Sequence, residues 1–224
     1  MLQTALQRRF DPNFCRIKAA IDSGEIGDTI VVKLCSRDPS PPPVDYVKGG
    51  GGIFKDMAIH DLDMSRFLMG EDPISILGVG SCHIDKAIEE LEEPTERFDT
   101  AAIVIKYPSG RTAMIDVCRQ APYGYDQRAE VLGTGGMVSS DNMYPTSVYK
   151  YTGEFTGHAD LPFDFFMSRY KEAYKQETLA FVDAVQGGKE TPVTGHDGIM
   201  ALKMAMAADL SAEEGRWVDL SEIH

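Results

Sequence analysis

Three side chains on one predicted helix have the types and the spacing to do chemistry: Asp56, His60 and Asp63 in KDMAIHDLDMSRFLMG. With about 3.6 residues per turn, this spacing places all three on one helix face. His60 can accept or donate a proton near neutral pH, because an unperturbed imidazole has a pKa of about 6.5. Asp56 can orient that ring or bind a substrate hydroxyl, and Asp63 can accept another hydroxyl hydrogen bond. The set predicts proton transfer and hydroxyl recognition.

The same spacing has two other interpretations. The three polar side chains could form the solvated face of an amphipathic helix whose opposite side, with Met57, Phe67 and Leu68, packs inward. Asp56 and His60 could instead be two ligands in a metal-dependent isomerase or hydrolase. The sequence marks no third ligand, so we expect no metal site.

No segment carries a credible nucleotide-binding fingerprint. Gly78-Val79-Gly80 is similar to the start of a G-x-G-x-x-G motif, but His83 occupies the third glycine position, where helix and strand must pack closely. GTGG at 133–136 lies between two strand-like segments and predicts a hairpin turn. We therefore expect no dinucleotide to bind tightly to this chain alone.

Hydrophobic periodicity predicts the elements that must position the site. NFCRIKAAIDSGEIG predicts an amphipathic helix with a stop at Gly24, and TIVVKLCSRD predicts a strand. Four glycines at 49–52 let the backbone flex or pass close to another group. The site helix then runs from about Ile53 to Met69 and is closed by Gly70.

The rest of the chain predicts a sheet followed by helices. Between residues 73 and 151 we expect the strands ISILGVGSCHI, TAAIVIKYP, RTAMIDVCRQ, QRAEVLGTGG, MVSSD and TSVYKY, with the acidic EELEEPTE as a solvated loop or helix end. Helices follow at 163–186 and 197–214. These patterns predict one α+β domain over residues 1–224, built on a mostly antiparallel sheet of about six strands.

Composition narrows the classes of function. The formal net charge of −13 repels nucleic acid and anionic membranes, so neither is an expected partner. Cysteines at positions 15, 35, 82 and 118 form no C-x-x-C pair, which favours reduced, mostly buried thiols over a zinc site or a disulfide framework. MLQTALQRRFDPNF lacks the apolar run of a signal peptide, and no stretch approaches the roughly 18 apolar residues of a membrane helix. We expect a cytoplasmic protein.

An ordered set of segments resembles a known family. RRFDPNFCRIKAAIDSGEIGD, SRDPSPPP, GGGIFKDMAIHDLDMSRFLMG, YGYDQRAEVLGTGG and RYKEAYKQETLAFVDAV follow one another along essentially the whole chain. This succession resembles the C-terminal domain of the Gfo/Idh/MocA oxidoreductases, and most closely the inositol 2-dehydrogenases among them. The resemblance implies a large, mostly antiparallel sheet with helices packed on one face. It also implies a substrate-covering domain that forms oligomer contacts and works with an N-terminal Rossmann domain for NAD(P).

The resemblance also implies roles for individual residues. In this family a secondary alcohol of a cyclic polyol or sugar is oxidised, hydride goes to nicotinamide and the hydroxyl proton goes to a histidine. His60 matches that general base, and Asp56 matches the carboxylate that partners it. Asp63 matches a ligand of a substrate hydroxyl, while Asp38 and Tyr125 match positions of further polyol contacts.

The chain departs from the family pattern in two respects. It has neither the glycine-rich fingerprint nor a Glu-Lys-Pro motif, so we expect the cofactor-binding domain to be missing and this chain alone to be inactive. The expected partners are a small polyol or sugar and further copies of the chain, joined through the open face of the sheet. The alternative is a non-catalytic polyol-binding protein or oligomeric scaffold derived from the same family.

Overall fold

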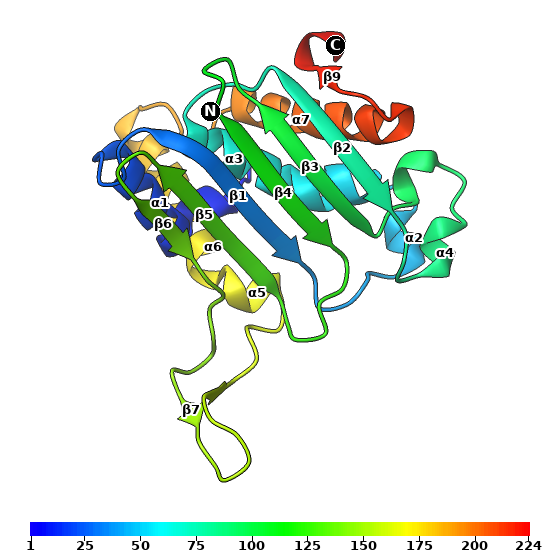
Figure 1. Ribbon diagram of the computed structural model, residues 1–224. Coiled ribbons are helices and arrows are strands. Elements are labelled where there is room, and N and C mark those ends of the chain that lie inside the picture. The colour runs from blue at the N-terminus through cyan, green and yellow to red at the C-terminus, as the bar shows by residue number, and fades with distance from the viewer.

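Seven strands form one mixed sheet in this computed structural model, which describes residues 1–224 (Figure 1). The order across the sheet is β6-β5-β1-β4-β3-β2-β9. Every neighbouring pair is antiparallel except β1 and β4, which confirms the mostly antiparallel sheet. The strands are β1 (Thr29–Arg37), β2 (Ser75–Ser81), β3 (Thr100–Lys106), β4 (Thr112–Cys118), β5 (Asp126–Gly133), β6 (Met137–Ser140) and β9 (Val218–Asp219).

The helices lie on one face of this sheet, as expected (Figure 1). Alternation along the strands explains why, since side chains of a strand point to opposite faces in turn. In β4, Ala113, Ile115 and Val117 are buried under the helices, whereas Met114 between them is 40% exposed on the open face. The helical face holds the main apolar core.

Helices of very different length connect and cover the strands. The α-helices are α1 (Pro12–Asp22), α2 (Val44–Val47), α3 (Ile59–Met69), α4 (Lys86–Glu89), α5 (Phe166–Arg169), α6 (Lys171–Gly187) and α7 (Gly195–Glu214). Short 3-10 turns are η1 (Gln7–Phe10), η3 (Pro94–Glu96) and η4 (Leu220–Glu222), and η2 (Phe54–Ala58) is a π-helical turn. Asp11 caps α1 by accepting hydrogen bonds from the backbone of Asn13 and Phe14. Gly70, in the left-handed conformation, ends α3 as predicted.

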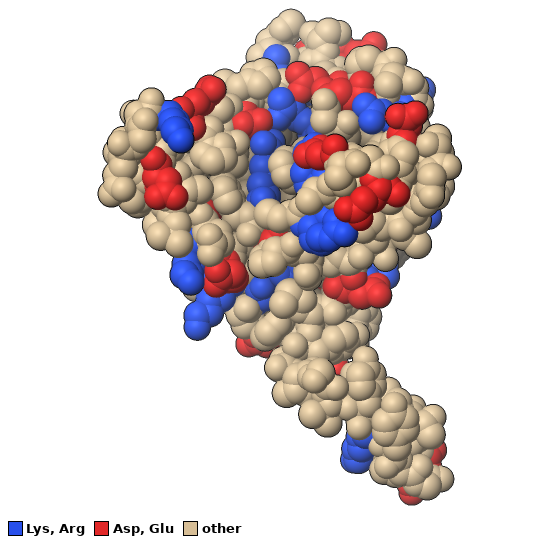
Figure 2. All heavy atoms as spheres, turned by 90° about the vertical axis from the view of Figure 1, so that its left-hand side faces the viewer, with Lys and Arg blue, Asp and Glu red and all other residues tan.

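One strand prediction is wrong, and one strand was not predicted. TSVYKY does not join the main sheet: β7 (Tyr149–Lys150) pairs with β8 (His158–Ala159) in a separate hairpin that projects from the body as an arm (Figures 1 and 2). The edge strand β9 was not predicted, because its two-residue pairing with β2 is too short to produce a periodic pattern. The hairpin turn predicted for GTGG is confirmed between β5 and β6.

Burial differs from expectation at the acidic segment and at the cysteines. EELEEPTE contributes a buried residue, Glu96, which is 5% exposed and accepts backbone hydrogen bonds. The four cysteines are unpaired, as expected, but none is fully buried: Cys15 is exposed and Cys35, Cys82 and Cys118 are partly buried.

No helix has both the length and the apolar character needed to cross a membrane.

Candidate functional site

A glycine-rich loop and a π-helical turn begin the site helix. The amides of Gly49 and Gly51 donate to Glu96 Oε1 at 2.6 and 3.4 Å. Gly52 has a φ of +73°, and a Cβ there would lie 2.0 Å from the carbonyl oxygen of Thr95. The glycines therefore let the backbone pass close to another group, one of the two expectations from the sequence. The loop leads directly into η2 and then α3.

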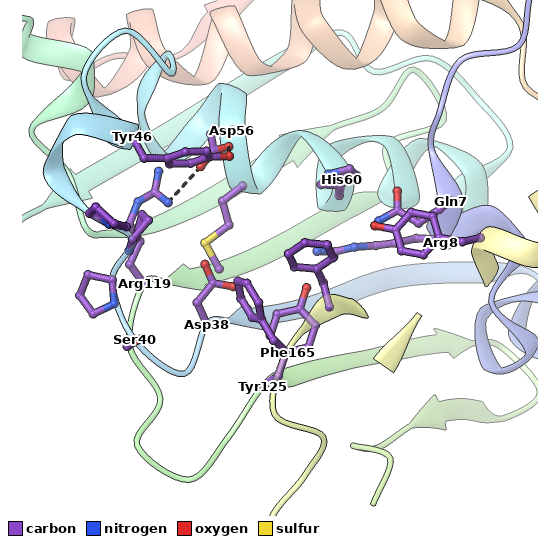
Figure 3. A pocket seen from close by; sticks show the side chains of 16 residues that line it. Gln7, Arg8, Asp38, Ser40, Tyr46, Asp56, His60, Arg119, Tyr125 and Phe165 are labelled. Atoms are coloured by element: carbon purple, nitrogen blue, oxygen red, sulfur yellow. Dashed lines mark hydrogen bonds and ion pairs between the residues drawn. The ribbon is translucent and has the colours of Figure 1, made fainter. Parts of the chain in front are cut away.

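The carboxyl end of β1 and the site helix border a cavity of about 570 Å³ (Figure 3). Its lining is rich in groups that can bind hydroxyls. The polar lining residues are Gln7, Arg8, Asp38, Ser40, Tyr46, Asp56, His60, Arg119, Tyr125 and Tyr174. Four of the five sequence-predicted site residues are among them, and Asp63 is not.

Asp56 is held at one end of this cavity by two partners. It accepts a hydrogen bond from Tyr46 Oη at 2.9 Å and pairs with Arg119 Nη1 at 3.0 Å (Figure 3). It makes no hydrogen bond to His60. Of the two roles expected for Asp56, orienting the ring is therefore not seen in this arrangement, while binding a hydroxyl stays open to it.

His60 is partly buried and has no hydrogen-bond partner in the protein. Its Nδ1 is enclosed and unpartnered, which leaves Nε2 as the ring nitrogen that borders open space. Burial lowers the pKa of His60 to about 3, and the positive charge of Arg8 lowers it further. The ring is neutral, the form that can accept a proton.

The alternative of a solvated helix face is wrong. Asp61, between two of the predicted site residues, is 2% exposed, and Asp63 is 1% exposed. Leu62 and Met64 are buried as well, so α3 is enclosed on most of its circumference. A helix in this position gains stability from packing rather than from contact with water.

Asp38 and Tyr125 line the cavity opposite the site helix (Figure 3). Burial raises the pKa of Asp38 to about 6, although the positive charges of Arg119 and Arg8 oppose the rise. Tyr125 packs edge-on against the rings of Phe165 and Tyr170, with centroids 5.6 and 6.1 Å away. Burial also raises the pKa of Tyr125, so its hydroxyl remains a donor.

Asp63 is directed to a different set of partners. Arg9 Nη2 lies 2.6 Å from Asp63 Oδ1, and Arg9 Nε donates to the other oxygen at 2.9 Å. The same Arg9 reaches Asp197 at 3.1 Å. This two-bond pair ties the N-terminal segment to the site helix and leaves Asp63 away from the cavity.

Sequence reasoning missed the two arginines of the site. Arg8 donates to Asp61 at 2.7 Å and to Ser36 at 3.1 Å, within a buried network. Arg119 follows β4 and is 1% exposed. Because β1 and β4 are parallel, their carboxyl ends meet at one edge of the sheet, which brings Arg119 near Asp38. The missing signal for Arg119 was the parallel pairing of β1 with β4.

The two glycines of the partial nucleotide-binding motif lie inside the sheet layer. Gly78 and Gly80 lie within β2, where a Cβ would meet the backbone of Ala208 at 2.5 Å and the ring of Phe98 at 2.5 Å. These glycines allow close packing inside the sheet layer and face no phosphate-sized space. No group of three or more His, Cys, Asp or Glu side chains is arranged to hold a metal ion.

Comparison with known proteins gives consistent matches along the chain. The model of an oxidoreductase family, C-terminal alpha/beta domain (Gfo/Idh/MocA), matches residues 18–220. Inositol 2-dehydrogenase of Rhizobium meliloti is 44% identical over 98% of this chain and 65% of that protein. The chain thus spans between 59% and 65% of the length of such curated relatives.

Solved structures agree with the sequence matches. A myo-inositol dehydrogenase from Corynebacterium glutamicum superposes with a TM-score of 0.91 at 39% identity, over 96% of this chain and 63% of the other. A scyllo-inositol dehydrogenase from Lactobacillus casei, with bound NAD(H) and scyllo-inositol, gives a TM-score of 0.86 at 26% identity. That match covers 98% of this chain and 64% of the other.

Proposed function

Because the chain belongs to the Gfo/Idh/MocA oxidoreductase family, as its C-terminal α/β domain, we propose that it is the substrate-binding half of an NAD(P)-dependent dehydrogenase. The substrate class is a cyclic polyol or sugar that carries a secondary alcohol, with inositol as the first candidate. Residues 1–224 form a single substrate-binding and oligomerisation domain. The cofactor site belongs to a part of the enzyme outside these residues.

The observation that carries this proposal is a neutral imidazole in a cavity lined with hydroxyl-binding groups. An uncharged polyol is recognised by several oriented hydrogen bonds rather than by charge. Asp38 and Asp56 can accept hydrogen bonds from substrate hydroxyls, and Tyr125 can donate or accept one. These hydrogen-bonding groups can hold the other hydroxyls of a polyol while the imidazole of His60 accepts the proton of the hydroxyl that is oxidised.

His60 is the proposed proton acceptor of the reaction. Oxidation of an alcohol requires its O–H proton to leave, so a base within hydrogen-bond reach lowers the barrier. Arg119 and Tyr46 hold Asp56 in place, and Asp56 then accepts a hydrogen bond from a neighbouring substrate hydroxyl. The low pKa of His60 makes the free ring a weak base. Part of the driving force for proton transfer must therefore come from the alcohol, whose O–H proton becomes more acidic as hydride leaves the same carbon.

Gly78 and Gly80, the partial nucleotide-binding motif, pack against Ala208 and Phe98, so hydride transfer is assigned to no residue of this chain. No amino-acid side chain accepts hydride, and that chemistry belongs to a nicotinamide. We expect the isolated chain to bind polyol without turning it over. Asp63 is a weaker candidate for a substrate ligand than the cavity residues, because Arg9 occupies both of its oxygens.

The open face of the sheet is the proposed surface for homo-oligomer contacts. Met114, Val79 and Leu132 are 40%, 59% and 43% exposed there. An antiparallel sheet covered by helices on one face leaves the other face free, and a second copy is the simplest cover for apolar side chains in an acidic protein. Sedimentation of the purified chain, compared with a Met114→Glu variant, tests this. A monomeric wild-type chain would contradict the proposed homo-oligomer contact.

Titration of the chain with myo-inositol, followed by calorimetry, tests the substrate assignment. We expect His60→Ala and Asp56→Ala each to raise the Kd about tenfold, because each removes one hydrogen bond to a bound hydroxyl. Glu213→Gln on an exposed part of α7 is the matched control. Unchanged affinity in both site variants would refute the assignment. Absence of binding by the wild-type chain would favour the non-catalytic scaffold.

A further inference from the structure

Behind the site helix, an ion pair joins η2 to α7. Lys55 Nζ lies 2.5 Å from Asp209 Oδ2, and the two side chains are 31% and 5% exposed. Lys55 immediately precedes Asp56 but does not line the cavity. The two consecutive residues are therefore held by different parts of the fold, Lys55 by α7 and Asp56 by Arg119 and Tyr46.

The buried carboxylate of Asp209 has a single partner, Lys55. Apart from Lys55, no group donates a hydrogen bond to either of its carboxylate oxygens, and both oxygens are buried. Burial raises the pKa of Asp209 to about 6, with Lys55 opposing the rise and the charge of Glu213 adding to it. A buried carboxylate with one partner destabilises a fold. Such departures from stable packing concentrate at positions that serve a function.

The π-helical turn explains what the pair can do. A π turn carries more residues than an α turn, so it is less stable and shifts the side chains that follow it. On one side, the aliphatic stem of Lys55 lies where a Cβ on Gly51 would approach it to 3.1 Å. On the other side, Asp56 must reach Arg119. Relaxation of the turn to α geometry would rotate Asp56 away from that partner.

We propose that the Lys55–Asp209 ion pair is a positioning device, which holds η2 in its π-helical register so that Asp56 stays on Arg119 and Tyr46. The pair contacts no substrate and acts only through the turn. Its effect on polyol binding rests on the function proposed above, whereas its effect on the turn does not.

Amide hydrogen exchange and myo-inositol titration of the chain test this inference together. Lys55→Met keeps the aliphatic stem and removes the charge, and Asp209→Asn keeps the shape of the carboxylate. We expect each to speed exchange of the amides at 54–58 about tenfold while exchange at the C-terminal end of α3 stays unchanged. We also expect each to raise the Kd for myo-inositol about fivefold.

Two further variants separate positioning from a general loss of stability. Lys55→Arg keeps the charge and should restore both readouts to within about twofold of wild type. Glu213→Gln removes the charge that adds to the rise in the pKa of Asp209, so the pair keeps its charges and exchange at 54–58 should not become faster.

Three outcomes decide the matter. Equal exchange at 54–58 in wild type, Lys55→Met and Asp209→Asn would overturn the inference. Faster exchange with an unaltered Kd would also overturn it, because the turn would then not position Asp56. If the wild-type chain binds no myo-inositol, the proposed function fails, and the exchange data alone decide whether the pair holds the turn.

Discussion

Arg119 Nη1 lies 3.0 Å from Asp56 Oδ2, so the carboxyl end of β4 is tied directly to the turn that begins the site helix. The guanidinium is 1% exposed, and its Nε and Nη2 have no hydrogen-bond partner. A buried charge with so few partners is costly by itself. Its contribution is to fix a carboxylate at the wall of the cavity.

Replacement of Arg119 should therefore weaken ligand binding. Arg119→Met keeps much of the volume but leaves Asp56 with Tyr46 as its only partner. We expect the Kd for myo-inositol to rise about tenfold, because a mispositioned acceptor loses its hydrogen bond. Arg111→Met is the control, since Arg111 starts the same strand segment and pairs with Glu71. Equal affinities of the two variants in calorimetry would contradict the role of Arg119.

Polyol binding should depend on pH through Asp38. Its pKa is raised to about 6, so the carboxylate that accepts hydroxyl hydrogen bonds is lost as the pH falls through 6. We expect the affinity for myo-inositol to rise severalfold from pH 5 to pH 7 and then to level off. Titrations at several pH values check this, and Asp38→Asn should abolish the dependence. A pH-dependent Asp38→Asn chain would assign the effect to another group.

His60 should make the fold sensitive to acid. The pKa of His60 is about 3 in the folded chain and near 6.5 when unfolded, so below pH 6.5 the unfolded chain binds a proton that the folded chain does not. Above pH 6.5 the ring is neutral in both states, and its titration does not lower the free energy of unfolding. Below pH 6.5 the free energy of unfolding falls by about 1.4 kcal/mol per pH unit as the pH approaches 3.

Comparison with His60→Gln isolates this contribution. The raised pKa values of Asp38 and Asp209 act in the opposite direction, so the difference between wild type and variant is the informative quantity. Denaturant unfolding between pH 4 and pH 8 should show this difference changing with pH. A constant difference would mean that His60 has the same pKa in the folded and the unfolded chain.

Asp63 should matter more for stability than for binding. Asp63→Asn removes the charge that faces Arg9 in a largely buried pair, and we expect a loss of about 3 kcal/mol in the free energy of unfolding. The Kd for myo-inositol should change less than twofold, because Asp63 does not line the cavity. A tenfold weaker Kd without loss of stability would restore the substrate role that the family resemblance implies.

Gly52 should tolerate no side chain. Gly52→Ala combines a positive φ with a Cβ placed 2.0 Å from Thr95 O. Gly70→Ala has a similar φ of +71° but no atom within 4 Å. We expect about 1 kcal/mol of destabilisation for Gly70→Ala and about 3 kcal/mol or more for Gly52→Ala. Thermal unfolding of both variants measures the difference, and equal Tm values would show that the loop relaxes freely.

The sequence predicts features that depend on local periodicity. The end of the site helix at Gly70 and the GTGG turn follow from local rules and agree with the structure. Four of the five proposed site residues also line one cavity. Arg8 and Arg119 escaped notice because their place depends on contacts between segments far apart in the chain. Asp63 has the helical spacing of a site residue, but Arg9, a partly buried residue of the N-terminal segment, pairs with it.

The parallel pairing of β1 with β4 also has a consequence for the order in which the chain assembles. Val31 of β1 pairs with Thr112 on one side and with Leu132 on the other, so β1 has no sequence-local neighbour in the sheet. The meander β2-β3-β4 needs only short connections and can form early, whereas long loops must close before β1 is enclosed. Asp38 follows β1 directly. We therefore expect the cavity to be completed after the meander has formed, so that ligand binding by the chain indicates that β1 has joined the sheet.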